Sequence, residues 1–121
     1  MILVDTSAWV EFDRATGSPV DTRLTSLVER GGPLAVTEPV IAEVLSGARS
    51  DSREHELRRL LARFTLLPLV AAIDFDGAVR VYRACRKAGV TPRGLIDCVI
   101  SAVALRHGAT LLAYDAHIVR I

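Results

Sequence analysis

The chain has 121 residues, a formal net charge of +1, and a composition in which half of the residues are hydrophobic. This length suits one compact domain with its own core, and the near-neutral charge excludes the globally basic character of proteins that coat nucleic acid. No apolar run approaches the roughly 20 residues of a membrane-spanning helix, and no signal-peptide pattern heads the chain, so we expect a cytoplasmic protein.

Short apolar runs alternate with amphipathic segments along the whole chain. The apolar runs predict strands at residues 2–4, 34–36, 66–70 and 110–113. Between them, apolar residues recur at helical spacing of three and four positions. These segments predict helices at residues 8–14, 20–28, 38–46, 57–64, 75–88 and 95–107.

Polar residues at the starts of the predicted helices indicate where the helices begin. Thr6 or Ser7 is predicted to cap the first helix, Thr37 the third, and Asp74 the fifth, because short polar side chains accept hydrogen bonds from free backbone N–H groups. Glycines then end several of these helices, as Gly47 does after the third.

The alternation of strands and helices predicts an α/β fold with three layers, in which helices flank a central, mainly parallel sheet. In such sheets, ligands bind beyond the carboxyl ends of the strands. Asp5 and Asp115 each follow a predicted strand directly. We therefore expect both carboxylates to lie at the same edge of the sheet.

Two further acids occupy unusual places. Glu43 lies in the helix after the second strand, and Asp97 lies in the first turn of the most apolar helix. Clustered carboxylates repel one another unless a cation neutralises them, and an all-oxygen ligand set favours Mg²⁺ or Mn²⁺. Such an ion can activate water for attack on a phosphodiester. In the alternative interpretation, Asp5 and Asp97 cap helices, and Glu43 and Asp115 are solvated.

Three segments together resemble the PIN-domain family, and within it the VapC-type ribonuclease toxins of type II toxin–antitoxin pairs. LVDTSAWVE is similar to the family's opening strand with its first catalytic acid, Asp5. TEPVIAEVLSGAR is similar to the helix that carries the family's glutamate, Glu43. GLIDCVISAVALRHGATLLAYD is similar to the helix and strand that carry Asp97 and Asp115. The resemblance covers nearly the whole chain, so we expect a single domain over residues 1–121.

The resemblance implies a Mg²⁺- or Mn²⁺-dependent endoribonuclease that cleaves single-stranded or looped RNA, such as tRNA or rRNA. Asp5 and Asp97 would bind the metal directly. Glu43 and Asp115 would bind a second ion or act through water. The family also implies a VapB-like antitoxin as partner, which would pack against the exposed side of the helix at residues 57–64, and a homodimer.

Other residues would support this chemistry. Thr6 and Ser7 follow Asp5 directly and are expected to orient it, or to act only as helix caps. Arg14, Arg86 and Arg93 lie near the ends of predicted elements, where they could contact RNA phosphates.

The sequence departs from the family's pattern near its end. Many relatives carry a further Asp two positions after the fourth acid, where this chain has His117, and the chain ends at Ile121 before the usual C-terminal strand. A catalytically impaired PIN-like interaction module is therefore an alternative. A phosphate-accepting receiver domain is a weaker one, because it needs a lysine after a late strand and the only lysine, Lys87, lies in a helix.

Overall fold

A four-stranded parallel sheet runs through the computed structural model, which describes residues 1–114. The order of the strands is β3-β2-β1-β4, so the first strand is internal. Each strand is parallel to its neighbours, which confirms the predicted sheet. The strands are β1 (Ile2–Val4), β2 (Leu34–Val36), β3 (Thr65–Leu66) and β4 (Thr110–Leu112).

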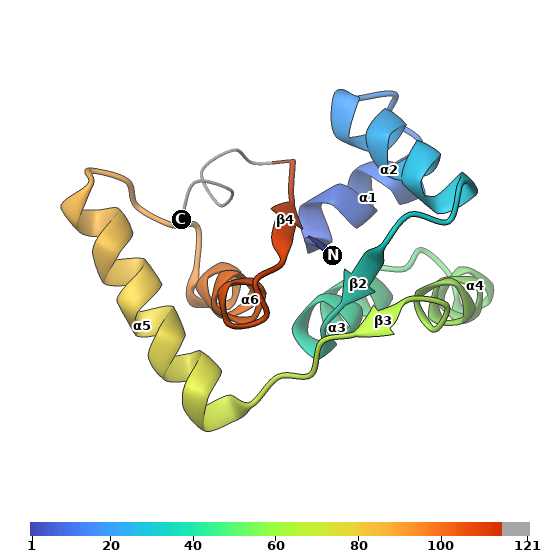
Figure 1. Ribbon diagram of the computed structural model, residues 1–121. Coiled ribbons are helices and arrows are strands. Elements are labelled where there is room, and N and C mark those ends of the chain that lie inside the picture. Colours follow the sequence, from blue (N-terminus) through green and yellow to red (C-terminus); the bar gives the residue numbers. More distant parts are fainter. Residues whose placement is uncertain (115–121) are drawn as a thin grey trace.

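Helices connect the strands and surround the sheet. Figure 1 shows α1 beside α2, α3 beside α4, and α5 beside α6. This arrangement confirms the predicted three-layer α/β class. The helices are α1 (Thr6–Arg14), α2 (Pro19–Glu29), α3 (Glu38–Ser46), α4 (Asp51–Leu61), α5 (Ala71–Lys87) and α6 (Leu95–Arg106).

The core fills the space between the sheet and its helices. Leu3 and Val4 of β1 are fully buried, as are Ile100 and Val103 of α6. Such burial of aliphatic side chains provides the main favourable free energy of folding. Among the described residues, no helix is both long and apolar enough to cross a membrane.

The third strand is shorter than the predicted 66–70, because the chain leaves the sheet directly after Leu66. The N–H of Leu67 still donates to Val36 O at 2.7 Å. Pro68 then has no N–H to donate, and the N–H of Leu69 turns to the Glu38 carboxylate at 2.8 Å. A side chain of α3 thus replaces the sheet as the hydrogen-bond partner.

The predicted cap position is correct for α3 and wrong for α1 and α5, and the alternative interpretation, in which Asp5 caps a helix, is confirmed. Asp5 occupies the N-cap position of α1, one residue earlier than predicted, and its carboxylate accepts the N–H of Ser7. Thr37 occupies the cap position of α3 but makes no capping hydrogen bond through its side chain. Helix α5 begins at Ala71, so Asp74 lies inside its first turn and reaches back to the N–H of Val70 at 2.8 Å.

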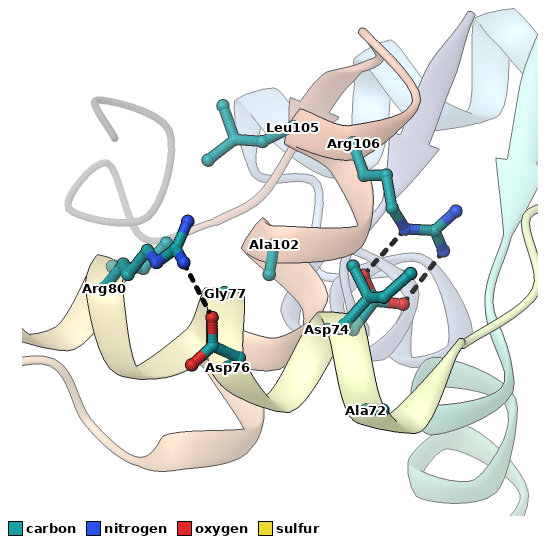
Figure 2. A pocket seen from close by; sticks show the side chains of 10 residues that line it. Ala72, Asp74, Asp76, Gly77, Arg80, Ala102, Leu105 and Arg106 are labelled. Carbon is teal, nitrogen blue, oxygen red and sulfur yellow. Dashed lines mark hydrogen bonds and ion pairs between the residues drawn. The ribbon is translucent and has the colours of Figure 1, made fainter.

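Asp74 also joins α5 to α6 through an ion pair between its buried carboxylate and the partly exposed guanidinium of Arg106. Its carboxylate is 1% exposed and accepts hydrogen bonds from Arg106 Nε at 2.8 Å and Nη2 at 2.9 Å. Figure 2 shows this pair beside the exposed pair of Asp76 and Arg80 on α5. The hydrogen bonds from Arg106 hold the pKa of Asp74 below its usual value, against the opposing effect of burial, and the Val70 N–H acts in the same direction as Arg106.

Asp74→Asn should destabilise the fold by about 2 kcal/mol at neutral pH, because it removes the charge from hydrogen bonds to a charged partner. Because folding lowers the pKa of Asp74, this carboxylate contributes its stability at pH values above its pKa in the unfolded chain, about 3.9. The contribution is lost as the pH falls through the lowered pKa of Asp74 in the folded protein. Urea unfolding at neutral pH and at acid pH measures the difference between the variant and the wild type. This difference should shrink in acid.

Asp76→Asn is the matched control, since it removes an exposed i,i+4 ion pair on the same helix. It should change the free energy of unfolding by only a few tenths of a kcal/mol. If both variants lose the same free energy of unfolding, or if the loss in Asp74→Asn persists in acid, the role assigned to the Asp74–Arg106 pair is wrong.

Candidate active site

Asp5 lies where β1 ends and α1 begins. Its N–H donates to Leu112 O at 2.9 Å, which joins it to β4, and its side chain is almost completely buried at 2% exposure. Ser7 donates to Asp5 Oδ2 from its hydroxyl at 2.6 Å and from its N–H at 3.1 Å. Asp5 Oδ1 is buried and accepts no hydrogen bond in the described part of the chain.

Ser7 also connects this carboxylate to the end of β4. Its hydroxyl accepts a hydrogen bond from the N–H of Tyr114 at 3.0 Å. Tyr114 directly precedes the predicted site residue Asp115, which lies outside the described residues. The backbone leading to Asp115 is therefore held against the same side chain that orients Asp5.

Glu43 joins the opening segment through its neighbour Thr6. Glu43 is exposed on α3, and its Oε1 accepts a hydrogen bond from the Thr6 hydroxyl at 2.6 Å. Thr6 is the first residue of α1, directly after Asp5. The structure thus brings the second predicted acid beside the first motif, although 37 residues separate Glu43 from Thr6.

Asp97 lies in the first turn of α6 and is half-buried. It is followed by Cys98, whose thiol pKa is raised to about 11, mainly by burial and then by the nearby Cys85 and the charge of Asp97. The thiol therefore stays protonated at neutral pH. Both cysteines are free and buried, as expected of small core residues.

Within residues 1–114, no three His, Cys, Asp or Glu side chains gather closely enough to hold a metal ion. Asp115 is outside that range. The chemistry of the described acids nonetheless fits a divalent cation, because carboxylate oxygens are the ligands that Mg²⁺ and Mn²⁺ prefer. The buried Asp5 Oδ1 supports this fit, since a carboxylate oxygen without a donor is costly to bury unless a cation or another donor compensates it.

The three arginines that were predicted to contact RNA phosphates lie on different elements of the structure. Arg14 is exposed at the far end of α1, about 13 Å along the helix axis from Asp5. Arg86 is exposed in the last turn of α5, and Arg93 is exposed in the loop before α6. Arg86 and Arg93 thus precede Asp97 along the chain, whereas Arg14 lies on a different helix.

Sequence reasoning treated Thr37 only as a helix cap. Its side chain is completely buried, and its hydroxyl has no hydrogen-bond partner in the described chain. Strands β1 and β2 pair in parallel with Leu3 opposite Ala35. Continuing that register places Thr37 opposite Asp5. In the sequence, Thr37 directly follows the predicted second strand, as Asp5 follows the first. This shared position could have identified Thr37 as a site residue.

A hollow of about 590 Å³ lies between α5 and α6, away from these acids. Figure 2 shows Gly77, Ala102 and Leu105 along it, with the Asp74–Arg106 pair at one end. None of the predicted site residues lines this hollow. The candidate active site is therefore the acidic edge of the sheet.

Known proteins share both the sequence and the fold. The family model of the PIN domain matches residues 2–121. Ribonuclease VapC11 of Mycobacterium tuberculosis is 46% identical over 117 residues, which cover 96% of this chain and 87% of the relative.

Solved structures give the same architecture at lower identity. VapC20 of Mycobacterium tuberculosis, described as a sarcin-ricin loop cleaving toxin, has a TM-score of 0.67 at 19% identity and covers 98% of this chain and 92% of its own. VapBC2 from Rickettsia felis, solved with promoter DNA, has a TM-score of 0.68 at 20% identity. The match covers 92% of this chain and 85% of the solved chain. At this identity, the likeness supports the fold alone.

The family match confirms the resemblance inferred from the three sequence segments and rules out the receiver-domain alternative. The order of the acids, Asp5 after β1, Glu43 in α3 and Asp97 in α6, follows the pattern on which that resemblance rested. The chain belongs to the PIN-domain family and, within it, to the VapC type.

Proposed function

We propose that this protein is a metal-dependent endoribonuclease and the toxin of a VapBC-type toxin–antitoxin pair. The observation that carries the proposal is the buried Asp5 carboxylate, which has one oxygen fixed by Ser7 and the other without a donor among residues 1–114. The 46% identity to a protein named as a ribonuclease supports RNA as the substrate. The class of RNA would be tRNA or rRNA.

Asp5 and Asp97 would hold the metal ion, Mg²⁺ or Mn²⁺, with Asp115 and Glu43 completing the site. An ion of this kind lowers the pKa of a bound water and stabilises charge on the phosphate and on the leaving oxygen. The protein's contribution is to hold these acids in place. Asp5 is fixed through Ser7, and Glu43 is fixed through its 2.6 Å hydrogen bond with Thr6.

The antitoxin would be a VapB-like protein, since solved relatives include toxin–antitoxin complexes. The inner side of α4 is unavailable to it, because Leu57 and Leu61 are buried in the core. Its outer side carries a hollow of about 390 Å³ lined by Glu56, Arg59, Leu60 and Arg63. We place the antitoxin's contact there, and we propose that the toxin also forms a homodimer.

Asp5→Asn and Asp97→Asn should each reduce RNA cleavage by about a thousandfold or more, because each removes a negative ligand while preserving the shape of the side chain. Wild-type activity should require Mg²⁺ or Mn²⁺ and disappear in EDTA. Gel analysis of a structured RNA measures cleavage, and circular dichroism checks that each variant folds.

Asp51→Asn is the control, since Asp51 is an exposed acid at the start of α4. It should cleave like the wild type. Full activity of either site variant, or cleavage by the wild type in excess EDTA, would show that these carboxylates do not hold a catalytic metal.

Ser7→Ala should lower kcat roughly ten- to a hundredfold, because it removes a hydrogen bond to a charged group that fixes Asp5. Single-turnover cleavage at saturating RNA measures this effect. The exposed Ser52→Ala variant should retain wild-type kcat. Equal rates for Ser7→Ala and the wild type would argue that Ser7 only caps α1.

A further inference from the structure

The last turns of α5 carry a basic face. Arg83, Arg86 and Lys87 are exposed, and together with Tyr82 they line a shallow hollow of about 260 Å³. Their spacing of three and four residues places them on one side of the helix. We name this surface, made of Tyr82, Arg83, Arg86 and Lys87, the α5 groove.

The cations of the α5 groove make no ion pair within residues 1–114, unlike Arg80 one turn earlier, which pairs with Asp76. Cations near a helix C-terminus are favoured by the helix dipole, but this effect fades beyond the last turn. Arg83 lies before that turn and faces Lys87 four residues on, a like-charge spacing that destabilises helices. An anionic ligand would relieve this repulsion.

The α5 groove lies at the end of α5 that packs against the start of α6. Cys85 and Cys98 pack in one apolar cluster between α5 and α6. Cys85 directly precedes Arg86, and Cys98 directly follows Asp97. Figure 1 shows the two helices side by side, and axes of packed helices are about 8–10 Å apart. The groove is thus one helix away from a predicted catalytic acid.

We propose that the α5 groove binds the single-stranded RNA that flanks the cleaved bond, an inference that rests on the proposed function. Arg83, Arg86 and Lys87 contact the phosphates. Tyr82 is half-buried against the cysteine cluster, and its exposed part offers a surface on which an unpaired base stacks. The aromatic residue and the nearness of Asp97 favour RNA over an acidic protein segment.

The test compares the wild type with the triple variant Arg83→Gln, Arg86→Gln, Lys87→Gln. Anisotropy of a labelled single-stranded RNA in EDTA measures binding without cleavage, over a series of salt concentrations. Each lost phosphate contact lowers the salt slope by about 0.7, so the triple variant should lose about 2 from the slope and bind at least about tenfold more weakly. Cleavage of the same RNA with Mg²⁺ is measured in parallel.

The charge-matched control is Arg23→Gln, Arg30→Gln, Arg49→Gln, which removes three exposed cations from α2, the turn after it and the bend before α4. It should keep most of the affinity and the wild-type slope. If both triple variants weaken binding equally, or if the groove variant binds RNA like the wild type and instead loses the antitoxin, the groove proposal is wrong. If the wild type cleaves RNA in either of these cases, the proposed ribonuclease function still stands. A wild type that neither binds nor cleaves RNA contradicts both the groove proposal and the proposed function.

A separate observation concerns Thr37. Its buried hydroxyl and Asp5 Oδ1 both lack a hydrogen-bond partner in the described residues, and the β1–β2 register places the two residues opposite each other. Buried polar groups are usually paired, and of the four unpaired side-chain atoms in the described residues these two lie at adjacent strand ends, where one ligand would reach both. We infer that Thr37 is a positioning residue whose hydroxyl orients the group bound at Asp5 during cleavage, which again rests on the proposed function.

Thr37→Val keeps the shape of the side chain but removes the hydroxyl. It should lower kcat about tenfold at unchanged KM, without lowering the melting temperature, and Thr37→Ser should restore activity. If the hydroxyl is only an unsatisfied core group, Thr37→Val will instead be more stable than the wild type and cleave equally well, and the inference fails. The wild-type rate, measured in the same assay, tests the proposed function separately.

Discussion

The hydrogen bond from the Asp5 N–H to Leu112 O is the constraint on which the site depends. It extends the β1–β4 pairing to the residue where β1 ends, while the Asp5 carbonyl accepts the N–H groups of Ala8 and Trp9 and begins α1. Backbone bonds on both sides therefore fix the Cα of Asp5, and Ser7 fixes one oxygen of its side chain. Such preorganisation gives a buried carboxylate one orientation through local hydrogen bonds.

The position of Asp97 depends on a different set of contacts. Helix α6 is nearly buried, with Cys98, Val99 and Ile100 directly after the acid at 1% exposure or less. Its packing against α5 is close, because a Cβ added at Gly77 would lie 3.1 Å from Ala102 Cβ. The Asp74–Arg106 pair holds the other end of the same helix pair. The acid at the start of α6 is thus placed by packing along the whole helix.

The sequence predicted the features that local pattern controls. Buried parallel strands read as apolar runs, so the end of β1 and Asp5 directly after it could be located from the sequence alone. Competition between alternative hydrogen-bond partners could not be predicted in this way. Glu38 accepts the N–H of Leu69 at the point where the chain leaves β3. Asp74 pairs with Arg106, 32 residues away, and does not occupy the cap position of α5. Each of these contacts depends on tertiary structure, which periodicity does not encode.

The near-zero net charge conceals a separation of charge that bears on how RNA would approach. Asp5 lies at the carboxyl end of β1, and within residues 1–114 the cations at the end of α5 make no ion pair. A polyanion is repelled by the first surface and attracted by the second. If the α5 groove binds RNA and Asp5 holds a cation, as proposed, the two surfaces together would admit the strand in one orientation, and the cation would remove the repulsion only near Asp5. Specificity would then come from the placement of charge around the site rather than from its total.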